Sequence, residues 1–125
     1  MDSDEVNRFE QLQAQIQSLY TEIEALSRKK PDDAVNEFKL RLVNKVLEQA
    51  NSVLGEFNRP FADFQHFDSD NVPTNSDVLL ILSQYLSCLE KLRADNITGY
   101  GNEWYWMIDG QHSSIPTAPP RKLKY

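Results

Sequence analysis

The chain has 125 residues and a formal net charge of −6 at pH 7, and this length suits one compact domain. Hydrophobic residues make up 40% of it and charged residues 26%, so the chain is too apolar to be fully disordered. Its four glycines disfavour a turn-rich all-β fold and a glycine-rich nucleotide cradle, and its acidic balance argues against direct binding to nucleic acid.

The first predicted element is a helix over residues 5–30, because apolar side chains recur there at alternating spacings of three and four. Neither Gly nor Pro interrupts this range before its end. Phe or Ile stands at one position of each heptad and Leu at the other, a pairing that favours two-stranded coiled coils. The six residues of this heptad seam are Phe9, Leu12, Ile16, Leu19, Ile23 and Leu26.

Two interpretations of the heptad seam remain open at this point. In one, the helix pairs with another chain, either a second copy or a different protein. In the other, the seam packs against the second helix inside one domain.

A second helix is predicted over residues 31–56, since proline is tolerated in a first helical turn and acidic residues are favoured there. The short connection before it favours an antiparallel helical hairpin. All but one of its apolar residues, Leu40, form a broad stripe of helical period, which is typical of a helix that packs against more than one neighbour. The stripe consists of Val35, Phe38, Leu42, Val43, Val46, Leu47, Ala50, Val53, Leu54 and Phe57.

The segment from Gly55 to Pro73 is predicted to be an ordered, irregular linker whose phenylalanine rings pack onto the helices, because several exposed rings would be costly. A third helix is predicted over residues 75–96, with Thr74 or Ser76 as its N-cap. Since this helix is apolar around much of its circumference, we expect it to be central to the core.

Strand-forming residues follow, and Asp109-Gly110 is a good type I′ turn, so a small β-hairpin is predicted over residues 103–115. Within it, Trp104 and Trp106 share one face, which either closes the core or contacts a partner. Residues 116–125 are predicted to be an extended, Pro-rich basic tail that stays loose unless a partner holds it. The fold class is therefore mainly α, with residues 1–115 as a single helical domain.

No catalytic residue, metal site or cofactor is predicted. Cys88 lies on an apolar helical face, where a thiol is typically a small buried hydrophobe. His66 and His112 are far apart in the sequence, in two predicted loops. The stretch 68–71 resembles the start of a calcium loop, but the glycine and glutamate that such a loop requires are missing from their positions.

The chemistry of the chain favours a cytoplasmic protein with no membrane association. Its first five residues are acidic and polar and lack the basic, apolar pattern of a signal peptide. A single cysteine favours a reducing compartment. The apolar runs are far shorter than the ~20 residues that cross a bilayer.

These observations together predict a non-enzymatic interaction or assembly subunit that self-associates or joins a hetero-complex. We expect its contact surface to comprise the six residues of the heptad seam, with Trp104 and Trp106. The alternative is an acidic inhibitor or nucleic-acid mimic that occupies a basic groove on a partner, suggested by the acidic segments at 2–5 and 63–70.

Overall fold

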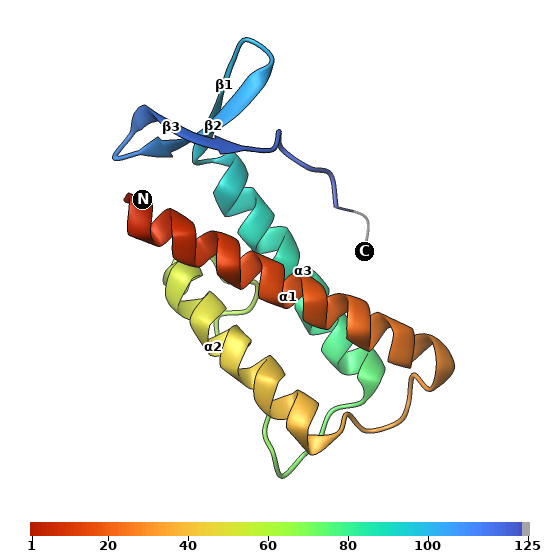
Figure 1. Ribbon diagram of the computed structural model, residues 1–125. Coiled ribbons are helices and arrows are strands. Elements are labelled where there is room, and N and C mark those ends of the chain that lie inside the picture. Colours follow the sequence, from red (N-terminus) through yellow and green to blue (C-terminus); the bar gives the residue numbers. More distant parts are fainter. Residues whose placement is uncertain (124–125) are drawn as a thin grey trace.

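The computed structural model describes residues 1–123 and shows three helices followed by a small antiparallel sheet (Figure 1). The predicted mainly α fold with a small C-terminal β element is confirmed at this level. In chain order the elements are α1 (Ser3–Lys29), α2 (Glu37–Asn58), α3 (Asn75–Ala94), β1 (Ile97–Tyr100), β2 (Glu103–Ile108) and β3 (Gln111–Thr117).

Helix α1 is long, uninterrupted and well capped. The Asp2 carboxylate accepts a hydrogen bond of 2.8 Å from the Glu5 amide, and Arg28 and Lys29 stand in the last turn, where cations complement the helix dipole. The helix runs antiparallel to α2 and packs most extensively along α3 (Figure 1). Its ridge of apolar side chains therefore forms one wall of the core.

Helix α2 begins at Glu37, so the prediction that it starts at residue 31 is wrong. Residues 31–36 instead pair their backbone with the segment before α3. The Val35 amide donates to the Pro73 carbonyl at 3.0 Å, and the Asn75 amide donates to the Asp33 carbonyl at 2.9 Å. Asn36 then caps the helix by accepting from the Lys39 amide at 2.8 Å. This tertiary pairing competes successfully with the local helical preference of the sequence.

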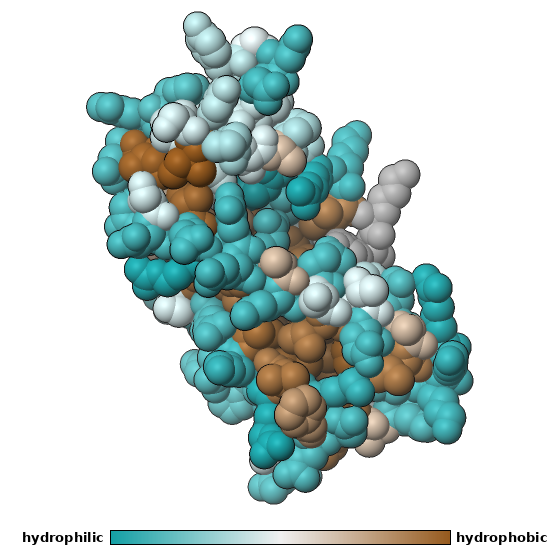
Figure 2. Space-filling model, in the orientation of Figure 1, coloured by the Kyte–Doolittle hydropathy of each residue, from teal (hydrophilic) through white to brown (hydrophobic). Residues whose placement is uncertain are grey.

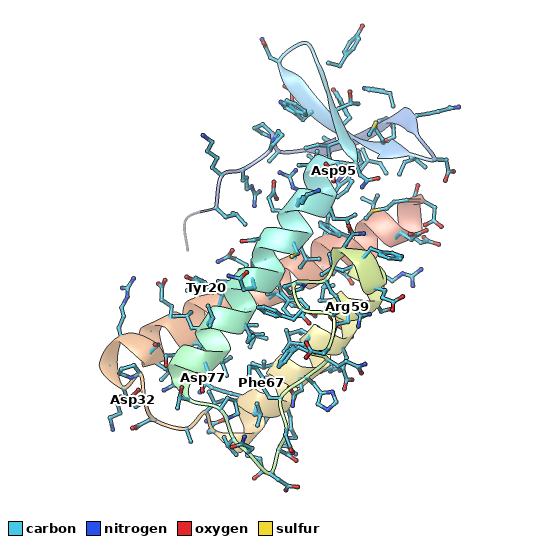
Figure 3. The ribbon with its side chains drawn as sticks, turned by 180° about the vertical axis from the view of Figure 1, so that it is seen from behind. Tyr20, Asp32, Arg59, Phe67, Asp77 and Asp95 are labelled. Atoms are coloured by element: carbon cyan, nitrogen blue, oxygen red, sulfur yellow. The ribbon has the colours of Figure 1, made fainter. Side chains whose placement is uncertain are left out.

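The linker of residues 59–73 runs along α2 on the side shown in Figure 3. The Asn44 side chain fastens it, accepting from the Phe67 amide at 2.8 Å and donating to the Phe67 carbonyl at 3.0 Å. Phe64 and Phe67 pack against the core as predicted, and their rings meet edge to face. The same prediction is wrong for Phe57, which belongs to α2 and is 95% exposed, and for Phe61, which is 40% exposed.

Helix α3 packs against both α1 and α2 and ends at Ala94. A capping box starts it, because Thr74 and Asp77 each accept a hydrogen bond from the other's backbone amide. Tyr85 is fully buried, and its hydroxyl donates to the Asn51 side chain of α2 at 2.6 Å. This bond joins the two helices inside the core.

The C-terminal sheet has three strands in the order β1-β2-β3, so the prediction of a two-stranded hairpin is incomplete. The extra strand, β1, pairs with β2 in the register Gly99↔Trp104. A side chain at Gly99 would meet the Trp104 ring at 3.4 Å, so glycine gives that ring its space. The predicted turn is confirmed, because Asp109 and Gly110 both have positive φ, as a type I′ turn requires.

The sheet is fixed to the helices through β2. The Trp106 ring is fully buried and meets the Phe9 ring of α1 edge to face, with 5.3 Å between centroids. Its indole N–H donates to the Glu10 carboxylate at 2.8 Å, so the ring's polar edge is satisfied as well. The sheet therefore covers the start of α1 and the end of α3 (Figure 1).

Candidate functional site

The six residues of the heptad seam face the interior of this chain. Phe9, Ile16 and Ile23 are fully buried and Leu12 is 4% exposed. Only Leu19 and Leu26 are partly open to solvent. Of the two tryptophans proposed for the same surface, Trp106 is fully buried and Trp104 is half-buried. The seam residues thus contribute mainly to the core, and any contact surface on α1 has to lie on its flank.

An open apolar groove lies on that flank, between α1 and α2. Its volume is about 480 Å³, and Leu19 of α1 faces Leu42 and Val46 of α2 across it. Leu42 is 39% exposed, and Phe38, one turn earlier on α2, is 62% exposed. Figure 2 shows the resulting hydrophobic patch where α1 and α2 lie side by side. The remaining lining residues are Ala14, Gln15, Ser18, Lys45 and Gln49.

A second cavity of about 250 Å³ continues the groove toward the start of α1. Gln15 and Gln49 line both cavities, so the two form one depression, which we call the α1–α2 groove. Leu12 and Val53 supply the apolar floor of the second cavity. Its other lining residues are Arg8, Gln11 and Ser52.

The charged residues that line the α1–α2 groove are cationic, although the chain as a whole is acidic. They are Arg8 at one end and Lys45 at the other. Arg41 adds a further positive charge beside Phe38, with its guanidinium 6.0 Å from the ring centroid. Acidic side chains flank the groove but do not line it. Asp2 and Glu5 line a neighbouring cavity at the Arg8 end. Glu22, one turn after Leu19 on α1, pairs with Lys39 of α2 at 3.6 Å.

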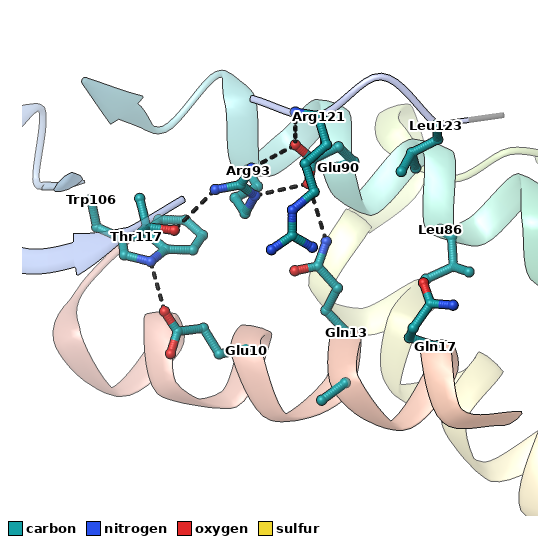
Figure 4. A pocket seen from close by; sticks show the side chains of 11 residues that line it. Glu10, Gln13, Gln17, Leu86, Glu90, Arg93, Trp106, Thr117, Arg121 and Leu123 are labelled. Carbon is teal, nitrogen blue, oxygen red and sulfur yellow. Dashed lines mark hydrogen bonds and ion pairs between the residues drawn. The ribbon is translucent and has the colours of Figure 1, made fainter. Parts of the chain in front are cut away.

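A separate cavity, outside the α1–α2 groove, lies between α1, α3 and the C-terminal segment (Figure 4). It measures about 290 Å³, and two buried charged residues of α3, Glu90 and Arg93, form part of its lining. The Arg93 guanidinium donates two hydrogen bonds to the Glu90 carboxylate, of 2.8 and 2.7 Å. Glu90 also accepts from the Gln13 amide at 3.3 Å and from the Arg121 backbone amide at 3.0 Å.

All five N–H donors of Arg93 are used. Besides its two bonds to Glu90, it donates to the Thr117 hydroxyl at 2.9 Å and to the carbonyls of Ala118 and Pro119, each at 2.8 Å. The prediction of a loose tail from residue 116 is therefore wrong, because β3 runs to Thr117 and the next residues are tied to α3. Residues 124–125 of the predicted tail lie outside the described residues. We call Glu90, Arg93 and residues 117–121 the C-terminal clasp.

The electrostatics of the clasp favour a structural role. Burial alone would raise the pKa of the Glu90 carboxyl, but hydrogen bonds from Arg93, Arg121 and Gln13 and the positive charge of Arg93 outweigh it and lower that pKa. Glu90 is consequently held as a carboxylate with its acceptors occupied. Among residues 1–123, no buried side-chain N or O atom lacks a hydrogen-bond partner.

The other candidate chemical groups are not brought together. His66 lies 3.6 Å from Glu48 of α2, whereas His112 packs against the Tyr105 ring in the sheet. Burial raises the pKa of the Cys88 thiol, which disfavours the reactive thiolate. Within the described part of the chain, no group of three or more His, Cys, Asp or Glu is placed to hold a metal ion.

Sequence reasoning missed the residues that distinguish these two places. Phe38 and Leu42 belonged to the predicted stripe of α2, and its breadth was the signal that the helix needs a second neighbour. Glu90 and Arg93 stand three residues apart on α3, a spacing that usually indicates a surface pair. Nothing local in the sequence signals that residues 117–121 cover this pair.

Over residues 1–123, no helix is both long and apolar enough to cross a membrane. Comparisons with protein-family models, curated proteins and solved structures found no match to this chain.

Proposed function

We propose that the protein is a non-enzymatic interaction subunit that binds another protein through the α1–α2 groove. The observation that carries this proposal is the open apolar surface of Phe38 and Leu42, on a capped helix and beside a groove with an apolar floor. Contiguous apolar surface with a polar rim is typical of protein-binding sites. The C-terminal clasp offers a partner much less, because its buried polar groups are already satisfied within the chain.

This proposal keeps the N-terminal helix as part of the contact surface but changes which of its residues take part. Leu19, at the edge of the heptad seam, contacts the partner together with Leu42 and Val46 of α2. The fully buried seam residues hold α1 in place and set the depth of the groove. The broad apolar stripe of α2 then has both of its expected neighbours, one inside the chain and one outside it.

Site-specific photo-crosslinking tests the proposal. A photoreactive residue replaces Gln49, which is exposed and lines both parts of the groove, and the purified protein is irradiated in an extract of its source cells. The matched control carries the same residue at Gln84, which is exposed on α3 and lines neither part. We expect an adduct of defined mass from position 49 that is absent from position 84.

A second variant, Leu42→Glu, should abolish that adduct, since it places a charge in the apolar part of the groove while leaving the core intact. Equal adducts from both positions, or none from position 49, would contradict the proposal. An adduct that survives Leu42→Glu but disappears at high salt would instead favour the acidic inhibitor or nucleic-acid mimic.

A further inference from the structure

We infer that the partner presents an amphipathic helix with acidic residues flanking its apolar stripe, and that it is not a second copy of this chain. This inference rests on the proposed function and specifies the occupant of the α1–α2 groove. Three properties of the groove lead to it: its shape, the spacing of its apolar parts and the sign of its charges.

The shape suits a helix. Two antiparallel helices, α1 and α2, form the walls of the groove. A helix from the partner, laid along the groove, would pack against both of them as in a helical bundle. The groove extends along α1 from Arg8 to Leu19, which at 1.5 Å per residue is about 16 Å. A partner helix of about three turns spans this length.

The apolar parts of the groove are spaced for such a helix. One part is centred on Leu19 and Leu42, and the other on Leu12 and Val53. Leu12 and Leu19 are two turns apart on α1, which is about 10 Å along the groove. Partner side chains at positions i and i+7 reach both parts, and the residue at i+3 or i+4 lies over the uncharged glutamines between them.

The charges select an acidic partner. The lining of the groove carries Arg8 and Lys45, and Arg41 lies beside the exposed Phe38. In a two-fold dimer the same patch meets itself, so a groove-to-groove pairing of two copies brings these cations together. Like charges that face one another across an interface oppose association, whereas flanking carboxylates pair with them.

Two synthetic helical peptides of about 18 residues test the inference by fluorescence anisotropy. They share the same leucines at i, i+3, i+4 and i+7, but one has glutamates at the flanking positions and the other has lysines. We expect the glutamate peptide to bind about tenfold more tightly at low salt, because exposed ion pairs each contribute a modest amount. The double variant Arg8→Glu with Lys45→Glu should reverse the preference, since both side chains line the groove.

The matched control variant is Arg28→Glu with Lys91→Glu. It changes the net charge by the same amount at side chains that are 76% exposed and lie outside the groove lining. It should keep the preference for the glutamate peptide. Circular dichroism checks that both double variants remain folded.

Equal binding of the two peptides, binding of neither, or equal effects of the two double variants would overturn the acidic helix as occupant. Dimerisation of the protein alone that Leu42→Glu abolishes, seen by mass measurement over a concentration series, would overturn it in favour of a second copy. The crosslinks from position 49 test the proposed function separately, because they depend on neither the charge nor the helical form of the partner.

Discussion

The C-terminal clasp and the α1–α2 groove both lie beside α1, but the chain covers the first and leaves the second open. At the C-terminal clasp, the chain covers two charged side chains of α3 with its own last segment and gives every donor of Arg93 an acceptor. At the α1–α2 groove, Phe38 and Leu42 stay open, and no segment of residues 1–123 covers them.

The difference shows where binding capacity remains in this fold. A buried ion pair with satisfied hydrogen bonds has little left to offer a ligand, and losing one member leaves the other charge buried and unpaired. Covering an open apolar groove with a partner removes apolar surface from water, which favours association. The clasp should therefore respond to mutation through stability, and the groove through association.

The largest expected effect comes from charging the interior wall of α1. The variant Ile16→Asp places a carboxylate at a fully buried position without a partner, which we expect to unfold the chain at 25 °C. The variant Leu19→Asp, three residues along on the edge of the groove, should remain folded. Circular dichroism and thermal denaturation measure both, and a folded Ile16→Asp protein would show that the seam is not core.

Breaking the clasp should have the next largest effect. The variant Arg93→Ala leaves the Glu90 carboxylate buried without its counter-ion and removes three bonds to residues 117–119, so we expect a loss of about 3–5 kcal/mol in the free energy of unfolding. Urea denaturation measures this loss. Hydrogen exchange should also show faster exchange of the Arg121 amide, which bonds to Glu90.

The matched variant Arg93→Lys separates the charge of this side chain from its geometry. Lysine keeps the positive charge but cannot supply the planar fork of five donors, so most of the loss should persist. Full recovery with lysine would mean that charge alone holds the clasp. A loss below about 1 kcal/mol in Arg93→Ala would place the pair in the class of surface salt bridges.

A smaller effect is expected in the pH dependence of stability. Because the folded pKa of Glu90 lies below its ordinary value of 4.5, its contribution is present above pH 4.5 and is lost as the pH falls through the folded pKa. The variant Glu90→Gln should lower stability near neutral pH and reduce the further loss on acidification. Urea denaturation at a series of pH values from neutral down to about pH 3 measures both changes.

The exposed cap of α1 provides the control for this pH series. The hydrogen bond from the Glu5 amide lowers the pKa of the Asp2 carboxyl, so Asp2 acts in the same direction. Asp2→Asn keeps an N-cap and should change the acid dependence less than Glu90→Gln. If the two variants change it equally, the burial of Glu90 does not matter for its titration.

Much of the fold could be predicted from the sequence, because local patterns carry it. The heptad spacing located α1, the apolar run located α3, and Asp109-Gly110 fixed the β2–β3 turn. The start of α2 could not be predicted, since residues 31–36 are held by backbone pairing with residues 73–76. Strand β1 could not be predicted, because it is only four residues long and contains Gly99, a residue that weakens a strand pattern.

The candidate site was less predictable than the fold. Periodicity identified the apolar residues of α1 and α2 but not which of them lie at the open edge, because that depends on how far apart the helices pack. Leu19 and Ile16 look equivalent in the heptad pattern, yet one borders the groove and the other is fully buried. The clasp could not be predicted, because its hydrogen bonds join residues 13, 90 and 121, which are distant from one another in the sequence.

That distance has a consequence for how the protein is made. The last acceptors that Arg93 needs lie 24–26 residues after it, so α3 is synthesised before its buried guanidinium can be satisfied. This end of the bundle closes only when residues 117–119 join it. A chain that stops before them should carry a half-satisfied charge in its core, which makes incomplete products targets for proteolysis.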